Sequence, residues 1–300
     1  MFKSIQARTA VYSKSILIAV LISLITTIMI MLLSSSGFFQ NYELKSLDFF
    51  QRFNAPVEDA EVLMVEIDQK SLTALSEQGI QWPWPRQMYV PLIELCANAG
   101  ARAIIFDIIL SEPSSYGKQD DLELAQAIQR AQNVFLPMNL SAKEAYRTNV
   151  SAIKRFGFQE KVPEFLFREA KSYIRPVEEL VEGTKGLGDV IISPDRDGVY
   201  RKIPLFTRFR DYLFPSLAVA PVMDKFSFSG KSIFFDGDLL FTSNRGELFL
   251  HFYGKAFQFP KLNALEMISA FQNPDSPLFN KVVSQIRDRF IIIGLTAPGL

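Results

Sequence analysis

One apolar stretch near the N-terminus constrains this 300-residue chain more than any other feature. Residues Ser15–Leu33 carry no charged side chain over 19 positions. As an α-helix with a rise of about 1.5 Å per residue, this run spans about 28 Å, close to the hydrocarbon thickness of a bilayer. The apolar core of a signal peptide is usually only about 7–15 residues long. The run therefore predicts an uncleaved transmembrane helix over residues 15–35, with a cleaved signal peptide as the alternative.

The charges beside the apolar run indicate its orientation. Lys3, Arg8 and Lys14 precede it without any acidic residue, and the eight residues after it carry no charge. Basic flanks stay on the cytoplasmic side of a membrane. We expect residues 1–14 in the cytoplasm and residues 42–300 as an extracytoplasmic domain held to the inner membrane.

Composition excludes several classes of protein. Lys+Arg and Asp+Glu number 32 each, so no net positive field points to a nucleic acid partner. With Cys96 as the single cysteine, the chain cannot form an internal disulfide or a cysteine metal cluster. With His251 as the single histidine, it has no multi-histidine metal site. We expect no cofactor and no metal, with Cys96 buried as a small apolar side chain.

Hydrophobic patterning predicts an α/β fold. Short apolar runs alternate with segments whose apolar residues recur every three or four positions, and three such strand-then-helix cycles indicate an open parallel sheet with helices on its faces. The crossovers are long enough to join parallel strands. The expected strands are 62–68, 103–107 and one starting at Val134, and the expected helices are 71–75, 86–99 and one starting at Asp120 or Asp121.

The second half of the chain predicts additions to this sheet. Residues 141–188 are mixed and charged, and we interpret them as an insertion. Turn residues between apolar runs predict two β-hairpins, over 189–206 and 233–241. Residues 290–294 form a buried strand close to the end of the sequence, so we expect the domain to be incomplete at its C-terminus.

The candidate site lies where two strands end. Asp68 and Asp107 each close an apolar strand, and ligands of open α/β sheets bind outside the carboxyl ends of strands. Between them lies the stiff segment W-P-W-P-R, which contains Trp82, Trp84 and Arg86. We predict that these five residues bind a small polar ligand or a cation. As alternatives, the aspartates cap helices or pair with Arg86, and the tryptophans cover the sheet edge.

Residues 195–198, D-R-D-G, look like the start of a calcium loop. The EF-hand pattern needs a third oxygen ligand at Val199 and a glutamate at Phe206, so the pattern fails. We expect a turn there instead.

Several segments together resemble the CHASE type-2 domain, an extracytoplasmic sensory domain of bacterial membrane receptors. The similarity runs from about residue 48 to the end, and W-P-W-P-R is its strongest piece. The other matching segments are L-D at 47–48, V-E-I-D at 65–68, G-A-R-A-I-I-F-D at 100–107, D-D at 120–121, S-P-D-R-D-G-V at 193–199, F-P-S-L-A at 214–218 and I-I-G-L-T-A at 292–297.

The resemblance implies a sensor. Domains of this family are typically followed by transmembrane helices and a cytoplasmic output such as an adenylate or diguanylate cyclase or a protein kinase. It implies no enzymatic activity for the residues present. Two alternatives remain open on the sequence: a membrane-anchored hydrolase using Asp68 and Asp107, and a scaffold that dimerises through its hairpins, given 27 phenylalanines in the chain.

Overall fold

The computed structural model describes residues 2–35, 38–51, 53, 61–144, 148–161, 166–195, 197–252 and 259–297. It divides into two compact units. The first comprises Met1–Pro56 with His251–Ala256, and the second comprises Val57–Leu250 with Phe257–Leu300.

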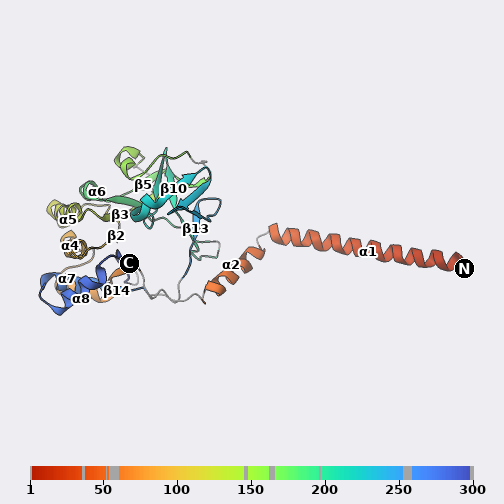
Figure 1. Cartoon of the computed structure of the whole chain (residues 1–300), viewed down its shortest axis with the longest axis horizontal. Coiled ribbons are helices and arrows are strands. Elements are labelled where there is room, and N and C mark those ends of the chain that lie inside the picture. The colour runs from red at the N-terminus through yellow and green to blue at the C-terminus, as the bar shows by residue number, and fades with distance from the viewer. Residues whose placement is uncertain are drawn as a thin grey trace. The chain divides into compact units, whose positions relative to one another are not determined.

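The first unit contains two helices, α1 (Phe2–Ser35) and α2 (Phe38–Gln51). Within α1, Ile16–Ser35 has a mean hydropathy of 3.0 and none of its length is buried. By length and composition this is a helix that can cross a membrane, as the sequence predicts. The red ribbon in Figure 1 shows α1 as one continuous helix.

The second unit is built on a mostly parallel sheet. Its strand order is β14-β1-β15-β2-β3-β6, and β5 also pairs with β3 as its one antiparallel member. The C-terminal strand β15 lies between β1 and β2, paired with both over its length. The strands are β1 (Val62–Ile67), β2 (Ala103–Asp107), β3 (Val134–Ser141), β5 (Ser172–Ile174), β6 (Gly186–Asp189), β14 (Lys261–Asn263) and β15 (Phe290–Leu295).

All the α-helices of this unit cover one face of the sheet (Figure 1). Each parallel connection, β14 to β15, β1 to β2, β2 to β3 and β3 to β6, moves in the same direction along the sheet. Because such connections share one hand, their helices fall on the same side. The predicted α/β class with a mostly parallel sheet is confirmed, and its α-helices lie on one face of the sheet instead of two. The helices are α3 (Gln69–Glu77), α4 (Val90–Asn98), α5 (Lys118–Ala131), α6 (Glu178–Gly183), α7 (Ala264–Gln272) and α8 (Pro277–Ile286).

The main core lies between these helices and the sheet. In β1 the buried positions alternate, with Leu63, Val65 and Ile67 turned to the helices. Ile291 and Ile293 of β15 continue that layer. This period of two follows from the pleat of a strand, which sends successive side chains to opposite faces.

The second face of the sheet carries a smaller apolar cluster. Ala103, Ile105 and Phe135 pack there against Leu217 and Ala220. Gly188 of β6 allows this contact, because a Cβ on it would lie 2.3 Å from the Cα of Leu217. The segment around Leu217 therefore packs directly on the backbone of the sheet.

The remaining strands form small sheets. Residues 141–188, interpreted as an insertion, supply β5 and β6 to the main sheet. The hairpin over 233–241 is confirmed as β11 paired with β12, but the one over 189–206 is wrong, because β7 pairs with β13 instead. These elements are β4 (Arg168–Ala170), β7 (Lys202–Pro204), β8 (Phe206–Phe209), β9 (Tyr212–Pro215), β10 (Phe226–Ser229), β11 (Ser232–Phe235), β12 (Asp238–Leu240), β13 (Glu247–Phe249) and the 3-10 helices η1 (Arg86–Tyr89), η2 (Val150–Ala152), η3 (Lys154–Phe156) and η5 (Ala220–Lys225).

Candidate functional site

The tryptophan segment packs into the core. Trp84 is 1% exposed, and its ring lies 5.9 Å from that of Trp82 and 6.1 Å from that of Tyr89. Trp82 is half-buried against the main core, and the bond between Trp82 and Pro83 is cis. These contacts favour the structural alternative for the tryptophans, in which they cover the sheet.

Arg86 is held by the start of α5 and not by the strand-end aspartates. Its Nε donates to Asp121 at 3.3 Å, and its Nη2 donates to the carbonyl oxygen of Glu112 at 2.9 Å. The backbone N–H groups of Arg86 and Gln87 both donate to the carboxylate of Asp120, at 2.7 and 2.9 Å. The expectation that Arg86 reaches toward Asp68 and Asp107 is therefore wrong. Arg86 instead holds the W-P-W-P-R segment to the start of α5.

Asp68 caps a helix. Its side chain accepts hydrogen bonds from the backbone N–H and the hydroxyl of Ser71, at 2.8 and 2.7 Å, at the N-terminus of α3. Burial alone would raise the pKa of Asp68, but these bonds, together with one from Asn263, lower it. The carboxylate of Asp68 therefore serves as the N-cap of α3.

Asp68 and Asp107 do not form a pair. Asp107 ends β2 and is level with Gly294 of β15, whereas Asp68 follows β1 on the other side of that strand. Two strand spacings and two residues along the strand place their backbones about 12 Å apart. Two carboxylates so separated, one of them bonded to a helix terminus, do not make the acid–base pair of the hydrolase alternative.

Asp107 borders a cavity of about 240 Å³ on the second face of the sheet. Ile105 and Ile292 form its floor, and Leu217 packs over them. The cavity lies at the carboxyl end of β2, where ligands of open α/β sheets bind. The lining residues are Ile105, Asp107, Asp189, Val190, Ile192, Ile203, Ser216, Leu217, Ala218 and Ile292.

Two polar groups of this cavity have no partner among the described residues. The hydroxyl of Ser216 is buried without a hydrogen bond. The carboxylate of Asp107 forms no hydrogen bond or ion pair within the described part of the chain, and burial raises its pKa. The unpaired Ser216 hydroxyl is an exception to the rule that buried polar groups are satisfied, and Asp107 is a solvent-exposed carboxylate, so both groups are available to a ligand in this cavity.

Asp189, the second carboxylate of the lining, is fully occupied. It accepts from the backbone N–H of Leu140 at 3.0 Å and from the Thr207 hydroxyl at 2.7 Å, and it forms an ion pair with Arg168. Burial raises the pKa of Asp189, and the Arg168 charge and these hydrogen bonds oppose that rise. Asp189 therefore ties β6 to neighbouring strands.

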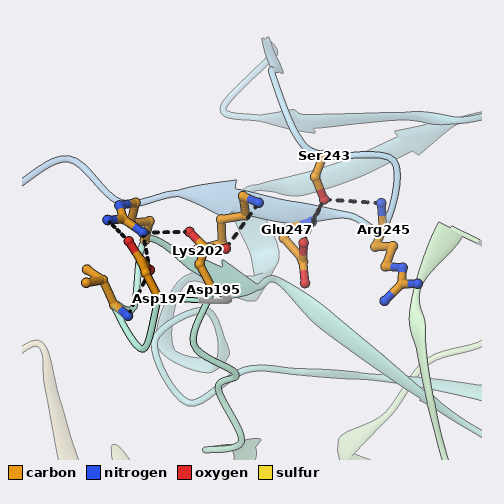
Figure 2. Close-up of polar contacts among 8 residues, drawn as sticks. Asp195, Asp197, Lys202, Ser243, Arg245 and Glu247 are labelled. Carbon is orange, nitrogen blue, oxygen red and sulfur yellow. Dashed lines mark hydrogen bonds and ion pairs between the residues drawn. The ribbon is translucent and has the colours of Figure 1, made fainter. Parts of the chain in front are cut away.

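A buried arginine holds the loop that connects two residues of the cavity lining, Ile192 and Ile203. Arg201 is 1% exposed; its Nη1 and Nη2 donate to the two oxygens of Asp197 at 2.9 and 2.7 Å, and its Nη1 also donates to Asp195 at 3.1 Å. The Nζ of Lys202 lies 3.5 Å from a carboxylate oxygen of Asp195. Figure 2 draws this ion pair as a dashed line. The hydrogen bonds from Arg201 lower the pKa of Asp197 to about 2. Both carboxylates of the D-R-D-G segment thus bind Arg201, and the N–H of Gly198 donates to the carbonyl oxygen of Asp195 at 2.9 Å, so the segment forms the expected turn.

A second turn beside this loop is closed by its own polar contacts. The hydroxyl of Ser243 donates to Glu247 at 3.0 Å and accepts from the backbone N–H of Arg245 at 3.2 Å (Figure 2). This turn leads into β13, which pairs with β7 and so positions Ile203 at the cavity.

Of the predicted site residues, only Asp107 reaches the cavity. Ser216 lines the cavity but was not predicted as a site residue, although it lies in a segment that carries the family resemblance, F-P-S-L-A. Within the described residues, no group of three or more His, Cys, Asp or Glu side chains could hold a metal ion.

The architecture defines a class: an α/β domain with a ligand-sized cavity at its sheet edge, in a chain whose N-terminal helix can cross a membrane. The CHASE2 domain model matches residues 24–300, and the chain belongs to this family. CHASE2 domains are extracytoplasmic sensory domains of signalling receptors, and they are not catalytic. Comparison with curated proteins and with solved structures returned no match.

Proposed function

We propose that the chain is the membrane-anchored sensor of a bacterial receptor, which binds a small ligand in the sheet-edge cavity. The observation that carries this proposal is the unpartnered Asp107 carboxylate beside an apolar cavity at the carboxyl end of a parallel sheet. Ligand binding shifts the domain between two states and passes the change to a cytoplasmic cyclase or kinase.

The apolar Ile16–Ser35 helix with its basic flank supports the orientation of the receptor. The second unit then lies outside the cytoplasmic membrane, in the periplasm or its equivalent. Family membership supports the same placement, because CHASE2 domains are extracytoplasmic.

Cysteine labelling in spheroplasts tests this orientation. Lys118 is 76% exposed in its side chain, and Cys96 is buried, so a Lys118→Cys chain presents one reactive thiol. We expect a membrane-impermeant maleimide to label Lys118→Cys directly and Lys3→Cys only after permeabilisation. The reverse pattern would contradict the proposal, and loss of the Lys3→Cys site from the mature chain would show a cleaved signal peptide.

The output of the receptor tests the sensing role. Ala218 lies exposed in the cavity lining, so Ala218→Phe places a ring in the space available to a ligand. In membranes carrying the native receptor, we expect this change to alter cyclic nucleotide synthesis or protein phosphorylation, while the surface change Asp275→Asn leaves both unchanged. If Ala218→Phe alters neither output, the cavity is not the sensing site.

A further inference from the structure

We infer that the cavity binds a small organic cation, a compact apolar body with one ammonium group that pairs with Asp107. This inference rests on the proposed function, because it names the ligand class of the same cavity. It follows from the size of the cavity, the chemistry of its walls, its local charge and its unpartnered hydroxyl.

The size and the walls define the body of the ligand. A volume of about 240 Å³ is below the roughly 300–1,000 Å³ of pockets for drug-sized molecules, so the ligand is small. Seven of the ten lining residues are apolar, counting Ile105, Val190, Ile192, Ile203, Leu217, Ala218 and Ile292. Such walls stabilise a hydrocarbon ring or branched chain by removing it from water.

The charge of the cavity defines the head group. The carboxylate of Asp189 is neutralised by Arg168, which leaves Asp107 as the uncompensated charge among the lining side chains. In the described part of the chain, no lysine or arginine forms an ion pair with Asp107. A ligand cation would supply that missing partner, whereas an anion would be repelled.

Gly294 leaves room for the head group. It lies level with Asp107 on the neighbouring strand, and a Cβ built on it would lie 3.4 Å from the Asp107 Cβ and 3.8 Å from its Oδ2. Glu66, level with Gly294 on the far side, is already paired with Lys261 at 3.1 Å. The space over Gly294 is thus bordered by one available carboxylate, which suits a singly charged ligand.

The hydroxyl of Ser216 supplies a second polar contact. Ser216 is 7% exposed, and its oxygen is buried without a partner. A hydroxyl can accept a hydrogen bond from an ammonium group or donate one to a ligand oxygen. Satisfying it on binding removes the cost of a buried unpaired group.

Titration calorimetry on the full chain in detergent micelles tests the inference with three probes of one shape. Cyclohexylamine, cyclohexanol and cyclohexanecarboxylate share a ring and differ in the head group. At pH 7.5 we expect cyclohexylamine to bind at least about tenfold more tightly than cyclohexanol, which corresponds to about 1.4 kcal/mol, because only the amine can form an ion pair with Asp107. Cyclohexanecarboxylate should not bind, because its charge has the same sign as that of Asp107.

Variants locate the effect. Asp107→Asn should weaken amine binding by about tenfold or more and leave cyclohexanol binding unchanged, Asp107→Glu should restore most of the amine affinity, and Ser216→Ala should weaken it by a few fold. The control Asp275→Asn, a surface carboxylate remote in sequence, should bind as the wild type does. Unfolding temperatures of each variant confirm that it is folded.

Three results would overturn the inference: no binding of the amine, equal binding of amine and alcohol, or amine binding that Asp107→Asn leaves intact. Each of these would remove the cation as ligand. The proposed sensing role is tested separately, by the labelling pattern and by the output of the Ala218→Phe receptor.

Discussion

Asp107 is a carboxyl group whose surroundings oppose its charge. It follows four buried residues of β2 and borders an apolar cavity, and burial raises its pKa. A carboxyl with a higher pKa in the folded chain holds its proton more tightly there than in the unfolded chain. Ionisation of Asp107 therefore lowers the free energy of unfolding. The same carboxylate is the group that we propose binds the ligand.

The pH dependence of stability should reveal that cost. As pH rises from the unfolded-state pKa of about 3.9 through the higher folded-state value, the wild type loses stability that Asp107→Asn does not lose. We expect the variant to unfold at a higher temperature than the wild type at pH 7, with the gap closing near pH 3.5. The effect is modest because the group is partly exposed.

Thermal unfolding of the full chain between pH 3.5 and 8 measures this difference. Asp275→Asn serves as a control, since its carboxyl is on the surface. A variant less stable than the wild type at pH 7 would mean that the Asp107 charge stabilises the fold through a contact.

Asp120 illustrates the opposite case, a buried carboxylate that is fully used. It accepts hydrogen bonds from the backbone N–H groups of Arg86 and Gln87 and from the hydroxyl of Ser114, so Asp120→Ala leaves three donors without this acceptor. We expect unfolding free energy to fall by roughly 2–4 kcal/mol. Lys118→Ala in the same helical turn, which removes only an exposed ion pair with Glu179, should cost at most about 0.5 kcal/mol. Chemical denaturation of both variants compares them, and equal losses would contradict this assignment.

At the scale of elements, the cavity depends on how the segment around Leu217 meets β6. A methyl on Gly188 would lie 2.3 Å from the Leu217 Cα and 2.6 Å from its backbone nitrogen. Backbone atoms cannot turn aside as a flexible side chain can. We expect Gly188→Ala to cost about 3 kcal/mol of unfolding free energy and to displace the segment that carries Ser216.

Gly294→Ala is the matched control, because its added methyl meets only ordinary contacts near Asp107. In the same denaturation experiment it should be within about 1 kcal/mol of the wild type. If Gly188→Ala is as mild as Gly294→Ala, the close approach to β6 does not hold the segment in place.

The loop before β7 depends on Arg201 in a different way. Its planar fork binds both oxygens of Asp197 and one of Asp195, a geometry that lysine cannot reproduce. Arg201→Lys should lower unfolding free energy by about 1–2 kcal/mol, whereas Arg245→Lys at an exposed position of the neighbouring turn should change it little. Thermal unfolding compares the two, and an unchanged Arg201→Lys chain would show that packing alone holds the loop.

At the scale of the whole molecule, local sequence patterns predicted the helices and strands better than they predicted which strands pair with one another. The apolar run of α1, the strands at 62 and 103 and the D-G turn at 236–237 are local signals, and each appears as an element in the structure. Strand order is a non-local property, and nothing in residues 290–294 indicates that they lie between β1 and β2. Asp68 and Asp107 are separated because β15 lies between the strands that they follow and end.

The candidate site was predictable only in part for the same reason. Asp107 could be found because a carboxylate at a strand end is a local pattern. Ser216 and Leu217 reach the cavity through packing between segments distant in sequence, which neither periodicity nor spacing reports. Arg86 was predicted as a ligand-binding residue, but in the structure its backbone N–H and its guanidinium group donate hydrogen bonds to Asp120 and Asp121 of α5.

The single-sided helix layer explains why the second face can serve as a binding surface. All parallel connections run in one direction, so the helices leave that face to short segments such as the one around Leu217. Under the proposed function, a ligand would bias the position of these short segments.

Methyl NMR of the full chain, with its isoleucine δ1 carbons labelled, tests most directly whether the cavity is the binding site. Ile105, Ile192, Ile203 and Ile292 line it, whereas Ile93 and Ile268 lie in the core on the helix side. On addition of cyclohexylamine, we expect chemical-shift changes that are confined to the four cavity methyl groups and are abolished by Asp107→Asn. Shifts centred on Ile93 and Ile268, or shifts that survive Asp107→Asn, would contradict it.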